Sequence, residues 1–361
     1  MNIPFHGSYR AEQVTFLLKP IQLAPIADTA VKEALIQSGQ KHYSEMLSPE
    51  YPPSARYLEL FRAACAQNEA RMAADCRQLA ANIAARHYRP PALVSLARPG
   101  TPVGVILRAI LSRHYGAPVA HYSISIIRDR GIDVNALRHI LAHHADTDLV
   151  FIDGWTGKGV IARELHRFIA AYNAQAGTNI DSGLYVLADL SGTAACAATA
   201  DDYLIPSALL NATISGLISR SILNEQIAAD DYHGCVYYRD LAPHDLSQTF
   251  ADRISTLADG ELPTAAPADT AQAATTAQHL LADIRARYGI SNDNLIKPGI
   301  GEATRVLLRR HPERLILRDP AAPATAHLVQ LAAEKQAIVE HRPDLPYHAV
   351  ALIRSHRPAN R

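Results

Sequence analysis

The sequence predicts an α/β protein in which a parallel sheet is followed by a small second domain of the α/β/α kind. Three observations lead to this fold class. Strand-like and helix-like segments alternate between residues 92 and 188, a stretch rich in Pro and Ala interrupts the chain near residue 265, and the charge balance changes behind it. With 361 residues, 48% of them hydrophobic and 19% charged, the chain is long enough for two domains.

The first domain is expected to begin with a helical region and to continue as a parallel sheet. Apolar residues recur at helical spacing, among many alanines, from residue 54 to residue 86. The sheet strands are expected over residues 92–97, 119–127, 148–152 and 184–188, with helices over 103–115, 134–144 and 158–174. Repeated β-α-β units favour a parallel sheet, and such sheets bind ligands at the carboxyl ends of their strands.

The domain boundary is expected in the Pro- and Ala-rich stretch. We assign residues 1–258 to the first domain, 259–275 to a linker and 276–361 to the second domain. Residues 276–361 contain thirteen Lys/Arg and eight Asp/Glu, so this domain is basic although the whole chain is neutral. Its expected elements are a helix through Leu307, a strand at 315–317, a helix at 327–334 and a strand at 348–353.

The residues behind the strand at 148–152 carry the clearest chemical signal. The segment is Asp153-Gly154-Trp155-Thr156-Gly157-Lys158-Gly159. Its glycines let the backbone approach a ligand, and amides at a helix start suit a phosphate. Thr156 adds a hydroxyl, Lys158 a cation and Asp153 a carboxylate for ribose hydroxyls. The spacing is too short for a Walker A loop, and the alternative is a tight turn that binds no ligand.

The two preceding strand ends also carry groups that suit phosphate. Arg98 and Thr101 follow the first strand, where they could bind phosphate oxygens or, alternatively, begin a helix with Thr101 as its N-cap. Arg128 and Arg130 flank Asp129 behind the second strand and suit a diphosphate or its magnesium complex, or else an exposed ion-paired turn. The neighbouring strand ends together predict an anion-binding edge of the sheet.

Several segments resemble known families. Residues 153–159 resemble the ribose-phosphate signature of type I phosphoribosyltransferases, with Gly154 in place of the second acid and a shorter spacer. Most of residues 1–255 resemble the bacterial StiP family. The segments that carry this resemblance are Gly7 to Tyr9, His42 to Met46, Ser125 to Asp133, Phe151 to Gly159 and Ala200 to Ser207. That family has been labelled "cysteine protease", and it has also been described as a phosphoribosyltransferase-like domain encoded with tellurium-resistance and stress genes.

The resemblance implies a phosphoribosyltransferase that uses 5-phosphoribosyl 1-diphosphate and Mg²⁺ to make or break an N-ribosidic bond on a nucleobase-like acceptor. Asp153 would hold the ribose, and residues 154–159 would hold the 5-phosphate. Arg98, Arg128 and Arg130 would face the diphosphate, which would carry the Mg²⁺ without direct protein ligands. The residues expected around the acceptor are Tyr43, Ser44, Glu45, Asp189, Ser191 and Asp202.

Residues 296–305 resemble the Pelota-type RNA-binding domain. In this fold class a Gly-rich loop and a helix start hold RNA backbone, and basic side chains add an attraction that salt weakens. The residues expected to bind RNA are Lys297, Gly299, Gly301, Arg305 and Arg309. The alternative is a basic face that binds nothing.

Cysteine and histidine patterns point away from metal and thiol chemistry. The four cysteines show no zinc-site spacing, and Cys196, which follows a strand among small residues, is the candidate nucleophile, although packing is the simpler interpretation. His139 and His143 lack the Glu of an HExxH motif. The neutral charge, the lack of a long apolar run and the lack of a signal-peptide pattern favour a soluble cytoplasmic protein.

Two other interpretations stay open. The chain could sense a sugar phosphate without turnover and bind structured RNA, or, as the least favoured hypothesis, it could be a thiol protease that uses Cys196. The expected partners are phosphoribosyl diphosphate or another ribose-phosphate ligand, structured RNA and a second copy of the chain, with no membrane among them.

Overall fold

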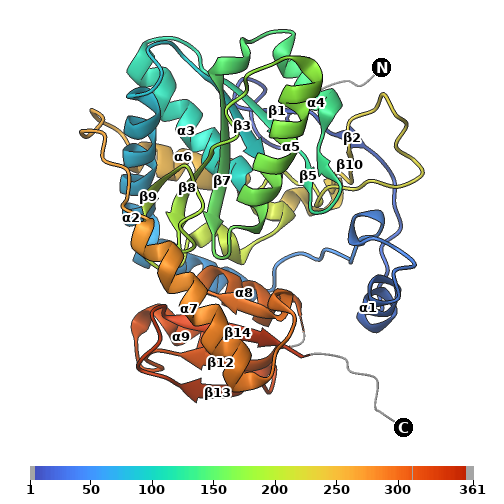
Figure 1. Cartoon of the computed structure of the whole chain (residues 1–361), viewed down its shortest axis with the longest axis vertical. Coiled ribbons are helices and arrows are strands. Elements are labelled where there is room, and N and C mark those ends of the chain that lie inside the picture. The colour runs from blue at the N-terminus through green and yellow to red at the C-terminus, as the bar shows by residue number, and fades with distance from the viewer. Residues whose placement is uncertain (1–4, 311, 355–361) are drawn as a thin grey trace.

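The computed structural model of the chain describes residues 5–310 and 312–354. Its larger unit is a six-stranded sheet with the order β1-β4-β3-β7-β8-β9, in which every neighbouring pair is parallel. The strands are β1 (Thr15–Phe16), β3 (Ala92–Leu96), β4 (Ala120–Ile124), β7 (Leu149–Thr156), β8 (Leu184–Asp189) and β9 (Cys196–Thr199). The predicted parallel sheet is confirmed (Figure 1).

Helices cover both faces of this sheet because its strands are apolar on both sides. Leu93 and Val150 belong to the core on one face, and Val94 and Phe151 belong to the core on the other. The helices on the first face are α2 (Ala55–Ala84), α3 (Gly100–Tyr115) and α6 (Ser247–Leu257), and those on the second are α4 (Val134–Leu141) and α5 (Val160–Ala176). No helix among the described residues is long and apolar enough to span a membrane.

Short elements extend from the sheet on the side of β4. Two small strand pairs and an isolated helix lie there, together with single turns of 3-10 helix, of which η1 (Tyr43–Glu45) and η3 (Pro206–Leu209) border the site described below. The small elements are β2 (Lys19–Pro20) paired with β10 (Gly234–Cys235), β5 (Ile126–Ile127) paired with β6 (Gly131–Ile132), and α1 (Thr29–Gln37).

The second domain has the predicted α/β/α arrangement. Its mixed sheet has the order β11-β14-β12-β13, in which only β12 and β13 run parallel. The apolar residues of α7 pack on one face of this sheet, and those of α8 and α9 pack on the other. Its elements are α7 (Ala271–Tyr288), β11 (Ile296–Pro298), α8 (Ile300–Arg309), β12 (Pro312–Leu317), α9 (Ala326–Glu334), β13 (Ile338–His341) and β14 (Ala349–Ile353).

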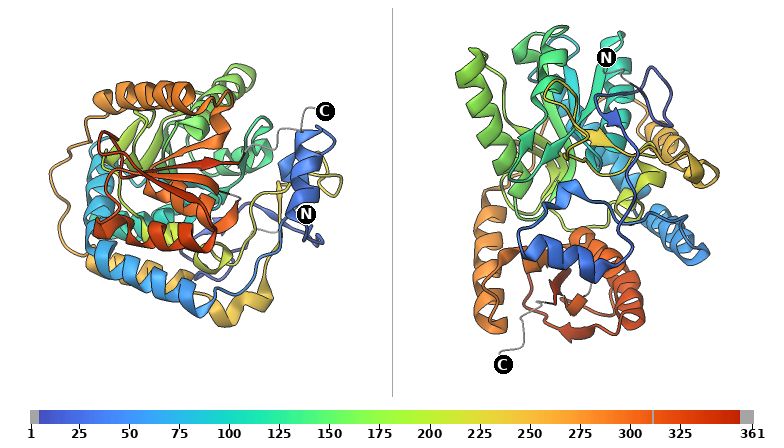
Figure 2. Two further views of the ribbon diagram at one scale, coloured as in Figure 1. Left: turned by 90° about the horizontal axis from the view of Figure 1, so that it is seen from below. Right: turned by 90° about the vertical axis from the view of Figure 1, so that its right-hand side faces the viewer.

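The C-terminal domain sits against one end of the larger unit, as the views in Figures 1 and 2 agree. One apolar cluster runs through both parts, with Ile300 and Ala303 of α8 in the same core as Ile205 and Ala208. The segment expected as a linker is extended only at first, because α7 already begins at Ala271. The end that the C-terminal domain covers is the one where the sequence predicts the ligand.

Candidate active site

The strand order of the sheet creates a topological switch point between β3 and β7. From β3 the chain crosses to β4 on one side, and it later enters β7 on the other. A side chain at Gly100 would come within 2.5 Å of the Ile152 carbonyl oxygen, so the start of α3 passes close to β7. Open parallel sheets bind ligands in the crevice outside the carboxyl ends of strands at such a point. The segments behind β3 and β7 therefore border the candidate site.

Strand β7 is longer than the sequence predicts. Residues 153–156, expected in a loop, continue the strand because Trp155 and Thr156 pair with Ala188 and Asp189 of β8. Only residues 157–159, which we call the β7 turn, separate the strand from α5. The hydroxyl of Thr156 accepts a hydrogen bond from the N–H of Gly159 (2.9 Å). This contact closes the turn and leaves the hydroxyl hydrogen of Thr156 able to donate, so its expected role as a donor to phosphate stays a prediction.

Asp153 is the buried acid of the site. It is 8% exposed, and its Oδ1 accepts a hydrogen bond from the N–H of Gly154 (2.8 Å). Burial raises the pKa of this carboxyl to about 7, and the positive charge of Arg305 acts against the increase. Such a group changes its protonation state near neutral pH, so it can accept or donate a hydrogen bond to a sugar hydroxyl.

The β7 turn faces the C-terminal domain. The ammonium of Lys158 donates a hydrogen bond to the carbonyl of Asp293. Burial lowers the pKa of Lys158 to about 8, and the charge of Lys297 lowers it further. A side chain at Gly157 would come within 3.5 Å of Cγ of Glu302. The turn that the sequence assigns to the 5-phosphate thus lies beneath cations and a carboxylate of another domain.

The two polar residues predicted behind β3 have different surroundings. Arg98 lies in the crevice, where its guanidinium pairs with Glu50 (2.6 Å) and donates to Oδ1 of Asn211 (3.1 Å). Thr101 is fully buried, and its hydroxyl is 2.8 Å from that of Ser123. The phosphate-binding role expected of Thr101 is therefore corrected, because its side chain belongs to the core between α3 and β4.

Arginines gather at the end of β4 around Tyr43. The N–H of Arg128 donates to the Tyr43 hydroxyl (2.9 Å), and Arg130 pairs with Glu45. Arg220, which the sequence analysis missed, donates to the Tyr43 carbonyl (2.6 Å), and its guanidinium lies 5.3 Å from the ring centre. Burial lowers the pKa of Arg220 to about 10. No motif marks this arginine, since only the tertiary fold brings it to the site.

The residues predicted around the acceptor do not form one pocket. Tyr43 and Glu45 contact the arginines, while Ser44 is fully buried. Asp189 is also fully buried, and its carboxylate accepts hydrogen bonds from the N–H and hydroxyl of Ser191, both at 2.8 Å. These contacts correct the prediction for Ser44, Asp189 and Ser191, because their polar groups are used to close local structure.

Asp202 has an unexpected role as a link between the domains. Its two carboxylate oxygens accept hydrogen bonds from the N–H of Ile300 (2.8 Å) and the N–H of His348 (2.9 Å). Burial raises the pKa of Asp202 to about 6. The carboxylate therefore caps the start of α8, a position where negative charge is favoured by the helix dipole.

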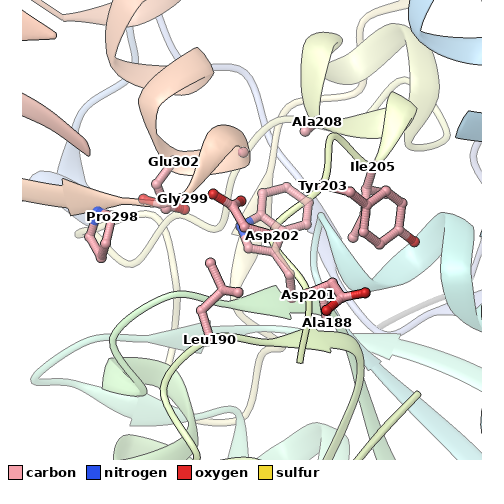
Figure 3. Close-up of a pocket in the computed structure, with 12 residues that line it drawn as sticks. Ala188, Leu190, Asp201, Asp202, Tyr203, Ile205, Ala208, Pro298, Gly299 and Glu302 are labelled. Carbon is pink, nitrogen blue, oxygen red and sulfur yellow. The ribbon is translucent and has the colours of Figure 1, made fainter. Parts of the chain in front are cut away.

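Two small cavities lie between the domains, and Trp155 lines both. One cavity is bordered by Asp202 and Glu302, and Figure 3 shows Asp202 and Leu190 facing residues of the C-terminal domain. The other is bordered by Arg98 and Arg305. The guanidinium of Arg305 lies 5.0 Å from the Trp155 ring centre, a distance suited to a cation–π contact.

Four of the residues predicted to bind RNA lie at this interface: Lys297, Gly299, Gly301 and Arg305. A side chain at Gly301 would come within 3.3 Å of the Trp155 indole, and one at Gly299 within 3.2 Å of Asp202. The helix start expected to hold RNA backbone is packed against the other domain. The side chain of Arg309 lies outside the described part of the structure.

All four cysteines are free thiols: Cys65, Cys76, Cys196 and Cys235. Burial raises the pKa of each, in the case of Cys65 to about 12. A nucleophilic cysteine needs a lowered pKa, because the thiolate is the reactive form.

Comparison with known proteins identifies the family. Residues 7–255 match the family model "Tellurite-like stress resistance cysteine protease StiP". A curated protein of Acinetobacter baylyi, named "Cysteine protease StiP", is 44% identical over 97% of this chain and 94% of its own length. The chain belongs to the StiP family. The C-terminal domain of this StiP family member, over residues 275–355, matches the PELOTA RNA binding domain.

Solved structures with partial likeness include three nucleotide-related proteins. A GMP complex of HGPRT-ase from Leishmania tarentolae is 15% identical, with a TM-score of 0.26 over 36% of this chain and 71% of its own. A purine phosphoribosyltransferase from Pyrococcus horikoshii is 18% identical, with a TM-score of 0.22 over 32% and 73%. A hypothetical protein from Neisseria gonorrhoeae with bound ppGpp is 14% identical, with a TM-score of 0.24 over 33% and 66%.

Proposed function

We propose that this StiP family member is a phosphoribosyltransferase that acts on 5-phosphoribosyl 1-diphosphate and a nucleobase-like acceptor, in the stress response that the family description names. The observation that carries the proposal is the crevice at the switch point. A buried acid, Asp153, lies near the end of β7, and Arg98, Arg128 and Arg220 form their contacts behind the neighbouring strands β3 and β4. Hypotheses of this type rest on the geometry of the site rather than on the fold.

Each part of the crevice has a task in this reaction. Asp153 would hold a ribose hydroxyl, and the β7 turn would hold the 5-phosphate. Arg98, Arg128 and Arg130 would neutralise the diphosphate, and Arg220 would support them from behind Tyr43. Among the described residues no group of three His, Cys, Asp or Glu side chains could hold a metal ion. Mg²⁺ would enter as part of the diphosphate substrate, whose charge it partly neutralises.

The reaction exchanges one bond at C1 of the ribose. The C1–O bond to diphosphate breaks as a C1–N bond to the base forms, and the nitrogen gives up its proton to solvent. The protein would act by positioning the two substrates and by stabilising charge on the departing diphosphate, both of which lower the barrier without a covalent intermediate.

Binding and turnover test this proposal directly. Calorimetry should show that wild type binds phosphoribosyl diphosphate with Mg²⁺ and that the double change Asp153→Ala with Thr156→Ala weakens the binding about a hundredfold. Diphosphate release in the presence of candidate bases should identify the acceptor. Failure of wild type to bind at millimolar ligand contradicts the proposal, and binding without turnover supports a non-catalytic sugar-phosphate sensor.

A thiol protease is the competing function, because the family and the curated relative carry that name. The raised pKa values of all four thiols argue against it for this chain.

We also infer an RNA partner from the PELOTA match. A filter-binding assay of the full chain with a structured RNA tests that inference, and binding that does not weaken with salt contradicts it.

A further inference from the structure

Three cations from two domains act on one carboxylate at the domain interface, and a fourth cation, Arg128, lies next to them. Lys158 and Arg128 come from the parallel-sheet unit, and Lys297 and Arg305 come from the C-terminal domain. The carboxylate is that of Glu302, which lies 3.3 Å from the guanidinium of Arg305 and 4.0 Å from the ammonium of Lys297. We call these five residues the interface cluster.

The cations of the interface cluster are held together in spite of their repulsion. Burial lowers the pKa of Lys297, Glu302 acts against this, and the charges of Arg310, Arg305 and Arg128 lower the pKa further. Lys297 is 24% exposed and Arg305 is 30% exposed, so solvent screens them only in part. Three further acids border the cluster: Asp153 is buried near Arg305 and Glu302, Asp293 pairs with Arg285 (3.0 Å), and Asp129 pairs with Arg128 at an exposed turn (3.2 Å). Such a group of neighbouring cations favours the binding of a further anion.

The position of Glu302 points to the kind of anion. Its Cγ would be 3.5 Å from a side chain at Gly157, so the carboxylate stem lies directly over the β7 turn. Lys158, the cation of that turn, is among the charges that lower the pKa of Glu302. A carboxylate is thus held by cations where the sequence predicts the phosphate of a ligand. Phosphate and carboxylate share the ability to accept charge-assisted hydrogen bonds from Lys and Arg.

We propose that the interface cluster is one anion site shared by the two domains, in which a phosphate group of a sugar phosphate or nucleotide takes the place of the Glu302 carboxylate. Lys297 and Arg305 then bind the same ligand as Lys158 and Arg128, and the C-terminal domain is part of the active site. The identity of the ligand rests on the proposed function, whereas the shared site rests on the cluster itself.

The shared site is tested with variants that should weaken anion binding and a variant that should strengthen it. The probes are inorganic diphosphate and phosphoribosyl diphosphate, each with Mg²⁺, titrated into the full chain by calorimetry. Lys297→Ala and Arg305→Ala should each weaken binding about tenfold, since each removes a charged contact. Glu302→Gln should strengthen binding about tenfold, because it removes the competing carboxylate. Lys335→Ala and Arg287→Ala, exposed positions in the same domain, are the matched controls and should change nothing.

The gain expected for Glu302→Gln cannot come from a misfolded variant, so it keeps the test decisive. The shared site is wrong if wild type does not bind diphosphate at millimolar concentration, or if all three variants bind like wild type. Wild-type transfer with unchanged variants would reject the shared site and keep the proposed function. The expected binding changes without transfer to any base would reject the function and keep the site.

Nucleic-acid phosphate is the other source of the same chemistry, and an RNA hairpin forms the second arm of the experiment. If Lys297→Ala and Arg305→Ala weaken RNA binding but leave diphosphate binding unchanged, the two residues serve RNA and the shared site is overturned. If RNA binding is unchanged while diphosphate binding weakens, the inference stands.

Discussion

Strands β7 and β8 each carry a buried aspartate near their C-terminal end, but the two carboxylates accept different numbers of hydrogen bonds from the chain. At the end of β8, Asp189 accepts hydrogen bonds from two groups of Ser191 and from the N–H of Ala194 (2.9 Å) within its own turn. On β7, Asp153 is likewise buried, but the contact that the chain gives it is the adjacent N–H of Gly154. The Asp189 carboxylate has three donors in its own turn, whereas the Asp153 carboxylate has one and keeps capacity for further hydrogen bonds.

The difference shows which strand-end acids are structural and which can serve a ligand. A buried carboxylate with three donors is a turn-closing group, and its loss leaves those donors without a partner. A buried carboxylate with one donor carries a raised pKa, because burial is only partly compensated. Such perturbed groups in a crevice are candidates for function.

The largest effect is expected on the structural side of the comparison. Asp189→Ala should lower the free energy of unfolding by about 4 kcal/mol, because three buried donors lose a charged acceptor. Asp181, an exposed acid that accepts a hydrogen bond from the N–H of Gly183 (2.8 Å), is the matched control. Urea denaturation of the two Ala variants measures the difference. Equal losses at positions 181 and 189 would break the comparison.

Asp153→Asn should have the next largest effect on the free energy of unfolding. In contrast to Asp189→Ala, it should favour the folded state increasingly as the pH rises. Since the pKa of Asp153 is about 7 in the native state against an ordinary 3.8, the native state binds more protons between these values. Wild-type stability therefore falls as pH rises from about 4 to about 7. The free energy of unfolding of the Asn variant minus that of wild type should therefore be about 2 kcal/mol larger at about pH 8 than at about pH 5. A difference that does not depend on pH would contradict this assignment.

The fold follows from patterns that are local in sequence, and most of it could be predicted. The apolar runs around Val94 and Phe151 predict strands buried on both faces, and the parallel sheet has them there. The end of β7 could not be predicted, because Trp155 and Thr156 stand in a Gly-rich segment typical of a loop and become part of the strand only through their pairing with β8. Strand length depends here on pairing rather than on propensity.

The sequence predicted the part of the candidate site that the parallel-sheet domain supplies, but not the part that the C-terminal domain supplies. Arg220 belongs to it, but a lone arginine in an irregular segment carries no sequence signal. Gly299 and Gly301 were assigned to RNA, yet they allow close packing on Asp202 and Trp155. A glycine that lets RNA approach and a glycine that lets another domain approach look the same in a sequence.

A smaller effect is expected at the β7 turn, which the Thr156 hydroxyl closes by accepting the hydrogen bond of the Gly159 N–H and which a longer contact to the Ser191 hydroxyl (3.4 Å) supports. Thr156→Val keeps the size of the side chain and removes the acceptor of the Gly159 N–H, which should cost about 1 kcal/mol of unfolding free energy. Thr156→Ser keeps the hydroxyl and should cost less than half as much. If the two variants lose stability equally, packing of the methyl group, not the hydrogen bond, holds the turn.

The smallest effect is expected at Cys196, which follows the end of β8 in the chain and begins β9. It is 3% exposed, and burial raises the pKa of its thiol although Asn82 opposes the increase. A raised pKa disfavours the thiolate, which is the nucleophilic form. Cys196→Ser should therefore leave phosphoribosyl diphosphate binding and transfer within about twofold of wild type. Cys65→Ser, at the less buried thiol, is the control. Loss of binding or transfer in the Cys196 variant alone, with an unchanged melting temperature, would show that this thiol takes part in the function and would contradict the prediction.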